Sequence, residues 1–244
     1  MQNFGLFIPA RFGSSRFPGK PLSDICGTPM IVRVANNAMN ALGPEKVFVV
    51  TDHHDIEAVC IGAGIQVIRV DDTLHSGTDR VARAVKKLGL ELDWIFNLQG
   101  DEPMLAPKDI TSFVSRTLGS VYDVTNAYFE SEDRSFCSSS NRIKIAVTES
   151  GRLAYASRAA IPFGSQKWRV QACIYGFQAE ALSWFASCGR PEGGLEELEN
   201  VELLRFLDAG RQVEMLRIEE ASHPVDTPED AAAVRVMVRE LESH

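Results

Sequence analysis

The sequence predicts an α/β protein in which a mostly parallel central sheet lies between layers of helices. Short apolar runs alternate with helical patterns through the first half of the chain, an order typical of β-α-β units. Polar clusters follow three of these runs, at the strand ends where such folds bind ligands. With 244 residues, 45% of them hydrophobic, the chain is long enough to bury the core of one large domain.

Each apolar run of the first half is bounded by residues that end a strand or begin a helix. The expected strands are 4–9, 46–51, 66–70 and 94–98, and the expected helices are 29–42, 52–63, 78–88 and 107–118. Pro29 suits the first turn of its helix, and Gly64 and Gly89 suit the ends of the next two helices.

The second half of the chain is less regular. Strands are expected at 123–129, 143–147, 169–177 and 213–218, a mobile polar loop at 131–141, and helices at 195–207 and 227–241. Asp226 could cap the last helix, with Pro228 at its first position. We find no internal repeat and no interdomain linker, so the sequence predicts one domain over 1–244.

The composition argues against several classes of protein. A formal net charge of -8 and a sequence pI of about 5.2 argue against a nucleic-acid-binding surface. No apolar run approaches the ~18 residues of a membrane span, and no secretory signal is apparent. The five cysteines are widely spaced and lack a C-x-x-C motif, which favours buried free thiols. We therefore expect a cytoplasmic protein that binds neither nucleic acid nor membranes.

A basic loop follows the first expected strand. Residues 8–21 have the sequence IPARFGSSRFPGKP and contain Arg11, Arg16 and Lys20 but no acidic residue. Glycines let backbone N–H groups approach oxygens closely, while Arg grips phosphate bidentately and Lys adds a mobile charge. A polyphosphate is therefore the expected ligand, and a solvated basic turn is the plainer alternative.

The basic loop differs from a P-loop. Five residues separate Gly13 from Gly19, where the P-loop motif has four. Pro21 occupies the place of the hydroxyl that binds magnesium in that motif. These differences argue against a Walker-type NTPase.

Two aspartates could hold a metal ion. Asp101 follows an apolar strand and a glycine, and Mg²⁺ prefers one or two carboxylates together with phosphate oxygens. A turn-forming Asp before Pro103 explains Asp101 equally well. Taken alone, Asp226 fits a helix N-cap better than a ligand, although it can serve in both roles.

Other segments also have both a functional and a structural interpretation. The turn at 75–80 leaves N–H groups and hydroxyls at a helix N-terminus, which could contact a pyrimidine or simply cap the helix. Arg158 could clamp a carboxylate or lie on the surface. His53, His54 and His223 lack the spacing of a catalytic or metal site, and we assign them no chemistry.

Taken together, these segments resemble one family, the 3-deoxy-manno-octulosonate (Kdo) cytidylyltransferases, also called CMP-Kdo synthetases. The resemblance covers nearly the whole chain, and the basic loop followed by the Gln-Gly-Asp-Glu-Pro motif is highly specific. The segments that carry it are 8–11, 15–22, 27–31, 50–53, 76–80, 97–103, 157–162, 174–177, 195–196 and 225–230.

The resemblance implies a three-layer α/β/α nucleotidyltransferase fold with a mostly parallel central sheet. It implies an enzyme that transfers CMP from CTP to the anomeric hydroxyl of an acidic sugar, Kdo or a related ulosonate, and releases pyrophosphate. It further implies Mg²⁺ as cofactor, a place in lipopolysaccharide biosynthesis, and a homodimer whose dimerisation region lies within 123–215.

The resemblance also assigns individual residues. The triphosphate is expected to contact Arg11, Ser14, Arg16 and Lys20, and the cytidine is expected to contact Ala10, Ser76, Gly77 and Thr78. Asp101 and Asp226 match metal ligands, and with Arg11, Arg16 and Lys20 they form the expected catalytic set. The sugar-contacting positions are Gln99, Arg158, Gln171, Tyr175 and Glu202.

Two positions depart from the family pattern. Gln171 stands where family members usually have His, and Leu203 stands where they usually have Gln. The nucleotide and metal positions are intact, so the departures concern the sugar, and we expect Kdo to be a poorer substrate than a related ulosonate. The alternatives are a cytidylyltransferase for a different acidic sugar and a CTP-binding module without turnover.

Overall fold

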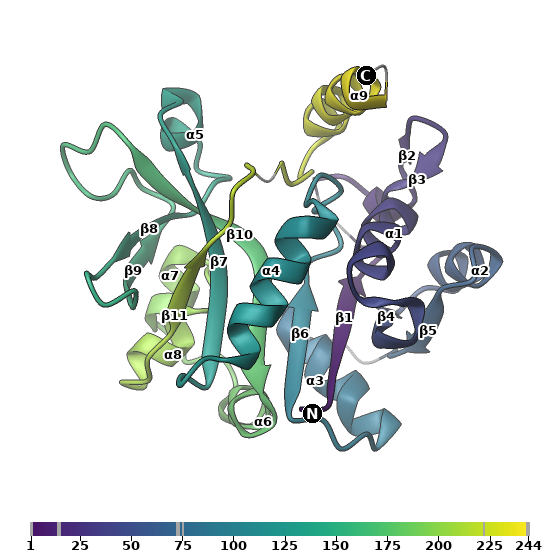
Figure 1. Cartoon of the computed structure of the whole chain (residues 1–244), viewed down its shortest axis with the longest axis horizontal. Helices are drawn as coiled ribbons and strands as arrows, with labels where there is room; N and C mark the ends of the chain where they lie inside the picture. Colours follow the sequence, from purple (N-terminus) through teal and green to yellow (C-terminus); the bar gives the residue numbers. More distant parts are fainter. Residues whose placement is uncertain (1, 14–15, 72–73, 75, 222, 243–244) are drawn as a thin grey trace.

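A mixed sheet runs through the part of the chain that the structure, a computed structural model, describes: residues 2–13, 16–71, 74, 76–221 and 223–242. In this part, nine strands form the sheet in the order β11-β7-β10-β6-β1-β4-β5, and β8 and β9 extend it beside β10 (Figure 1). The strands are β1 (Phe4–Ala10), β4 (Val47–Thr51), β5 (Gln66–Arg69), β6 (Trp94–Leu98), β7 (Val124–Ser131), β8 (Lys144–Val147), β9 (Leu153–Ser157), β10 (Trp168–Gln178) and β11 (Glu214–Arg217).

The strand directions confirm the mostly parallel sheet. β6, β1, β4 and β5 are parallel to one another, as expected for β-α-β units. β10 runs antiparallel to both β6 and β7, and β11 is parallel to β7. The carboxyl ends of β1 and β6 therefore meet at one edge of the sheet, the upper edge in Figure 1.

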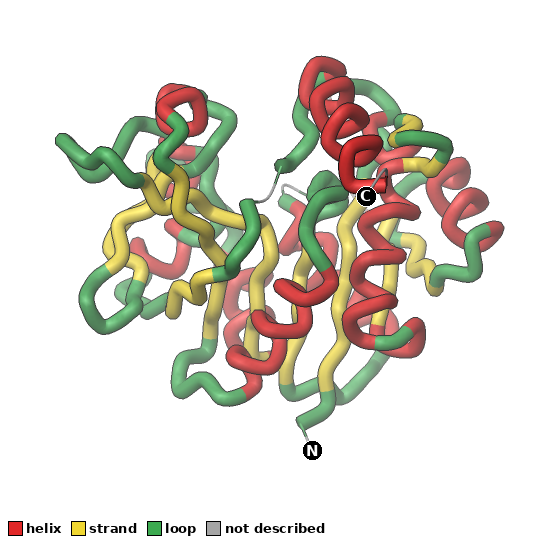
Figure 2. Tube along the Cα trace, turned by 45° about the horizontal axis from the view of Figure 1, so that its top comes forward, coloured by secondary structure: helices red, strands yellow, loops and turns green. Residues whose placement is uncertain are grey.

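Helices cover both faces of the sheet, which confirms the three-layer arrangement (Figures 1 and 2). One face carries α1 (Met30–Leu42) and α4 (Pro107–Leu118), with α2 (His54–Gly62) beside α1. The other face carries α3 (Gly77–Leu88), α6 (Ala179–Cys188), α7 (Leu195–Glu199) and α8 (Leu204–Asp208). Successive side chains of a strand point to opposite faces. In β1, Leu6 and Ile8 accordingly enter the core beneath α1, whereas Phe7 enters the core beneath α3.

A third, smaller core joins the two ends of the chain. It packs Ile25 and Met30 against Val225 and Val234. Ile25 lies in the hairpin of β2 (Asp24–Ile25) and β3 (Thr28–Pro29), and Met30 begins α1. Val234 lies in the C-terminal α9 (Pro228–Glu242), and Val225 precedes that helix. Two short 3-10 helices, η1 (Lys20–Leu22) and η2 (Pro44–Lys46), complete the elements near the N-terminus. α9 thereby returns the C-terminal segment to the basic loop (Figure 1).

Two predictions about the second half of the chain are wrong. The helix predicted at 195–207 is two helices, α7 and α8, because Asn200 takes a left-handed conformation with φ of 52°. The loop predicted at 131–141 contains α5 (Arg134–Ser138), whose first turn is capped by the Asp133 carboxylate. Asn and Asp favour such local conformations, but five-residue helices have no periodicity that a sequence pattern can detect.

Smaller differences concern β9, α6 and Pro29. The sequence pattern did not predict β9 or α6. Pro29 lies in β3, directly before the first turn of α1 rather than within it. The five cysteines are unpaired as expected, but only Cys60 and Cys137 are buried; Cys26 and Cys173 are partly exposed, and Cys188, at the last position of α6, is exposed. Within the described residues, no helix has both the length and the apolar character needed to cross a membrane.

Candidate active site

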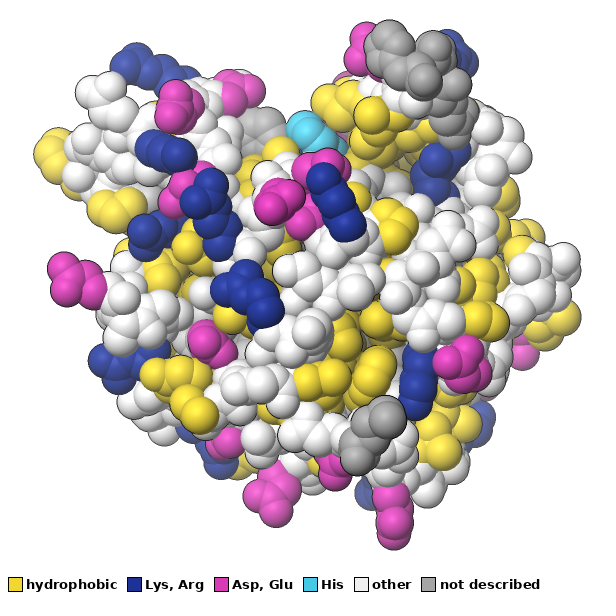
Figure 3. Space-filling view, in the orientation of Figure 1, with side chains coloured by type: hydrophobic (Ala, Val, Ile, Leu, Met, Phe, Trp, Pro, Cys, Tyr) yellow, Lys and Arg dark blue, Asp and Glu magenta, His cyan; other side chains and the backbone are white. Residues whose placement is uncertain are grey.

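A pocket of about 280 Å³ lies at the carboxyl ends of β1 and β6. The molecule is visibly hollowed along this upper edge, between the parts that carry α5 and α9 (Figure 3). The predicted site residues that line the pocket are Ala10, Arg11, Arg16, Lys20, Ser76, Gly77, Gln99, Asp101, Glu202 and Asp226. The structure thus brings together residues that the sequence places in five separate segments.

Lys20 is the centre of the charged cluster in this pocket. Its Nζ lies 2.8 Å from Asp101 Oδ2 and 3.4 Å from Asp226 Oδ1, and it donates to Val225 O at 2.7 Å. Burial alone would lower the pKa of Lys20, but the charges and hydrogen bonds of the two aspartates outweigh burial and raise it. Lys20 therefore remains a cation at neutral pH, held between two carboxylates.

Arg16 extends the charged cluster across the pocket. Its guanidinium donates to Asp226 Oδ1 and to Asn141 Oδ1, each at 3.0 Å. Arg11 also lines the pocket and is exposed. Ser14, the other predicted triphosphate contact, lies outside the described residues.

Contacts with the neighbouring strand hold the start of the basic loop. The Phe12 N–H donates to Asp52 Oδ1 at 3.2 Å, and the Phe12 ring stacks on His53 with centroids 3.9 Å apart. Arg80 donates to the other oxygen of Asp52 at 3.0 Å and to Val70 O at 2.8 Å. Asp52 and His53 thereby join the loop to α2 and α3, a structural role that the sequence left open.

The first turn of α9 is capped by Thr227 and not by Asp226. Thr227 Oγ1 accepts from the Asp230 N–H at 3.2 Å, and the Asp230 carboxylate accepts from the Thr227 N–H at 2.9 Å. This reciprocal pair resembles a capping box. The Asp226 carboxylate is consequently free to face Lys20 and Arg16.

A bulge in β10 anchors the Gln-Gly-Asp-Glu-Pro motif. The Cys173 carbonyl accepts from the Gln99 N–H at 2.9 Å, and the Cys173 N–H donates to Glu102 Oε1 at 3.1 Å. Gly100 packs so tightly that a Cβ there would lie 2.8 Å from the Pro9 carbonyl oxygen. The motif therefore needs this glycine to hold Asp101 against the end of β1.

Glu102 is buried behind the pocket, and this burial, aided by the charge of Asp101, raises its pKa from 4.5 to about 8. Because the folded protein then binds a proton that the unfolded chain loses near pH 4.5, the free energy of unfolding should fall as the pH rises from 5 to 8. Between pH 5 and 8 we expect the free energy of unfolding of the wild type to fall by roughly 3 kcal/mol more than that of Glu102→Gln, as measured by urea unfolding at each pH.

A matched control for this prediction is Glu180→Gln, which makes the same change at an exposed position of α6. It should follow the wild type at both pH values. Equal pH dependence of Glu102→Gln and the wild type would show that Glu102 titrates normally.

The predicted sugar contacts are only partly assembled at the pocket. Gln99 and Glu202 line it, whereas Tyr175 and Gln171 are buried and do not line it; Gln171 Nε2 lies 3.4 Å from Tyr175 Oη. Burial raises the pKa of Tyr175 well above its usual value, so the phenol stays protonated. Arg158 instead donates to the backbone carbonyls of Ser140, Glu199 and Asn200.

Two more positions differ from expectation. Thr78 is fully buried and donates its hydroxyl to the Glu202 carboxyl, so it supports a pocket residue rather than lining the pocket. Leu203, one of the two departures from the family pattern, is 1% exposed and packs in the core beneath α3. The change at Leu203 is therefore absorbed by apolar packing, and Gln171 is the departure that places a polar group near the site.

Among the residues that line the pocket, four with polar or charged side chains were not assigned from the sequence: Arg80, Arg190, Glu196 and Asn200. Glu196 is buried and held by Arg205, whose Nη2 lies 2.8 Å from Glu196 Oε1. The segment 195–196 carried the family resemblance, which was the available signal for Glu196. No signal in the sequence indicated Asn200, because it reaches the pocket only through its left-handed backbone conformation, which ends the helix predicted there.

The fold and this pocket define a nucleotidyltransferase: cations on a glycine-containing loop face two carboxylates at the strand ends. The family model described as Cytidylyltransferase matches residues 6–217, and the chain belongs to the cytidylyltransferase family. It is 38% identical over 236 residues to 8-amino-3,8-dideoxy-manno-octulosonate cytidylyltransferase of Shewanella halifaxensis (strain HAW-EB4), covering 93% of this chain and 95% of the relative.

Two further comparisons cover almost the entire chain. It is 37% identical over 244 residues to 3-deoxy-manno-octulosonate cytidylyltransferase of Anaeromyxobacter sp. (strain Fw109-5), covering 98% of both chains. The structure of CMP:2-keto-3-deoxy-manno-octonic acid synthetase complexed with CTP superposes with a TM-score of 0.87 at 30% identity, covering 98% of this chain and 99% of that one.

Proposed function

We propose that this protein transfers CMP from CTP to the anomeric hydroxyl of an ulosonate sugar and releases pyrophosphate. The observation that carries the proposal is the charged cluster in which Lys20 lies between Asp101 and Asp226 at the carboxyl ends of the strands. Cations for a triphosphate and hard oxygen ligands for a metal thus share one pocket. Relatives named for cytidylyl transfer to octulosonates support the same assignment.

In the proposed reaction the sugar hydroxyl oxygen forms a bond to the α-phosphorus as the bond between the α- and β-phosphates breaks. The hydroxyl proton passes to water, and pyrophosphate leaves. Arg16 and Lys20 bind the leaving phosphates and stabilise their developing charge. The pocket holds both substrates in line for the displacement, so positioning supplies much of the rate.

Asp101 and Asp226 are the residues that would hold Mg²⁺. Both carboxylates already lie within 3.4 Å of one ammonium nitrogen, so they are close enough to share a cation. Two carboxylates in a pocket for phosphates also suit the oxygen preference of Mg²⁺. When bound, Mg²⁺ would neutralise phosphate charge and lower the pKa of the attacking hydroxyl.

Pyrophosphate release tests the proposal directly. Purified protein with CTP and Mg²⁺ should release pyrophosphate only when 3-deoxy-manno-octulosonate or 8-amino-3,8-dideoxy-manno-octulosonate is added. Release with a different acidic sugar alone would support the second candidate, a cytidylyltransferase for that sugar. Binding of CTP with no release for any sugar would support a CTP-binding module.

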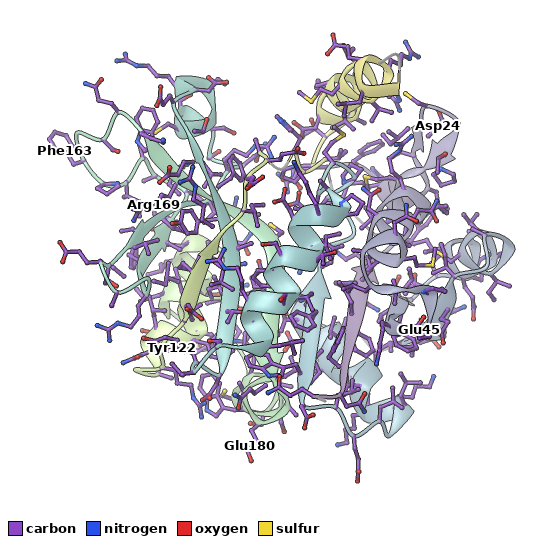
Figure 4. All side chains as sticks on the ribbon, in the orientation of Figure 1. Asp24, Glu45, Tyr122, Phe163, Arg169 and Glu180 are labelled. Carbon is purple, nitrogen blue, oxygen red and sulfur yellow. The ribbon has the colours of Figure 1, made fainter. Side chains whose placement is uncertain are left out.

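We further propose a cytoplasmic, one-domain enzyme of lipopolysaccharide biosynthesis that forms a homodimer through 123–215. Phe163 supports the dimer, because its fully exposed ring projects from the loop between β9 and β10 within this region (Figure 4). Phe163→Ser should shift the protein from dimer to monomer in sedimentation velocity experiments. Val121→Ser, which removes another exposed apolar side chain just outside the region, should leave the dimer intact.

A further inference from the structure

Asn126, on β7, holds both carbonyl groups that flank the bulge in β10. Its Nδ2 donates to Ala172 O at 3.0 Å and to Ile174 O at 2.7 Å. These carbonyls lie where the register between β7 and β10 shifts. Because both amide hydrogens of Asn126 are used in this way, its Oδ1 is the side-chain atom left to meet a neighbour.

Asn126 in turn determines which way the Gln171 amide faces. Gln171 Nε2 lies 3.0 Å from Asn126 Oδ1 and 3.4 Å from Tyr175 Oη. A reversed Gln171 amide would set its Oε1 against Asn126 Oδ1, two acceptors with no hydrogen between them. Gln171 Oε1 is therefore held away from Asn126, and it is buried without a hydrogen-bond partner among the described residues. A buried acceptor without a partner raises the free energy of the ligand-free protein. A ligand whose donor reaches this acceptor therefore binds more tightly than one without such a donor.

A second unpartnered acceptor lies on the neighbouring strand. Asn97 is directly opposite Tyr175 in the β6–β10 pair, so their side chains are neighbours on one face of the sheet. Asn97 Oδ1 is also buried, and no residue in the described part of the chain donates to it. Its Nδ2 donates to Thr78 Oγ1 at 2.9 Å, and Thr78 donates to Glu202, which lines the pocket. Two buried acceptors on the neighbouring strands β6 and β10 are thus left without a donor in the ranges that the structure describes.

We propose that Gln171 determines sugar specificity by accepting, through Oε1, a hydrogen bond from a primary ammonium group on the ulosonate. Asn126 is the positioning residue that keeps this oxygen from turning away. The inference rests on the proposed cytidylyl transfer to an ulosonate and names the class of sugar. An ammonium has three donors and no acceptor, whereas a hydroxyl has one donor and is itself an acceptor. The unpartnered oxygens of Asn97 and Gln171 thus match an amino sugar better than its hydroxyl counterpart.

The test compares kcat/KM for 8-amino-3,8-dideoxy-manno-octulosonate and 3-deoxy-manno-octulosonate at saturating CTP. The wild type should prefer the amino sugar by roughly tenfold or more. Gln171→Met keeps the side-chain length but removes the amide, and it should reduce this preference about tenfold to a hundredfold with the KM for CTP unchanged. Asn126→Ala should also reduce the preference, but it should add nothing in the Gln171→Met background because it acts through Gln171.

The matched control is Gln178→Met, the same change on the same strand at its far end, beside Asp123 and away from the pocket. It should keep the wild-type preference. Equal use of both sugars by the wild type overturns the inference, and so does an unchanged preference in Gln171→Met, the result expected if a buried water already satisfies Oε1. Release of pyrophosphate with neither sugar refutes the proposed function instead.

Discussion

Lys20→Ala should lower kcat/KM for CTP by roughly 10²–10³-fold, the loss seen when one donor to a developing oxyanion is removed. Two effects of the substitution add. The leaving pyrophosphate loses a cation, and the carboxylates of Asp101 and Asp226 lose the ammonium that lies 2.8 Å and 3.4 Å from them. Those carboxylates then repel the incoming triphosphate. Initial rates of pyrophosphate release at low CTP measure the change.

Lys108→Ala provides the control for Lys20→Ala. Lys108 is an exposed lysine of α4, paired with Glu220 at 2.7 Å and outside the pocket, so its loss should leave the rate near that of the wild type. Near wild-type turnover by Lys20→Ala at low CTP would remove Lys20 from the mechanism.

Asp226→Asn should raise the Mg²⁺ concentration needed for half-maximal activity by roughly tenfold or more, because a neutral amide is a weaker ligand for a hard cation than a carboxylate. Asp101→Asn should act in the same direction. A Mg²⁺ titration of pyrophosphate release, with CTP and sugar held saturating, gives the midpoint for each variant.

Thr227, the residue next to Asp226 that caps α9, provides the control for Asp226→Asn. Thr227→Ala removes the hydroxyl that accepts from the Asp230 N–H, so it should lower the free energy of unfolding by about 1 kcal/mol without moving the Mg²⁺ midpoint. If Asp226→Asn instead lowered the melting temperature and left the midpoint in place, Asp226 would be a structural residue of the helix start.

Much of the pocket could be predicted from the sequence because several of its lining residues lie in loops that directly follow strands. Apolar runs and glycines locate the ends of β1 and β6, and parallel strands bring their carboxyl ends to one edge. Arg11, Lys20, Gln99 and Asp101 therefore meet in the pocket that the pattern indicated. The predicted sugar contacts were harder to place, because Tyr175 and Gln171 are buried and Arg158 donates to backbone carbonyls instead.

Local sequence alone determined the alternation of strands and helices in the first half of the chain, since hydrophobic periodicity and helix-ending residues act within a few positions. Only the tertiary structure decided the roles of Asp226, Leu203 and Gln171. Asp226 reaches Lys20 because α9 packs back on the hairpin near the N-terminus, and Leu203 turns into the core. The Gln171 amide takes its direction from Asn126, a residue 45 positions away on another strand. Contacts between residues so distant in the chain depend on the path of the backbone, and no local pattern records that path.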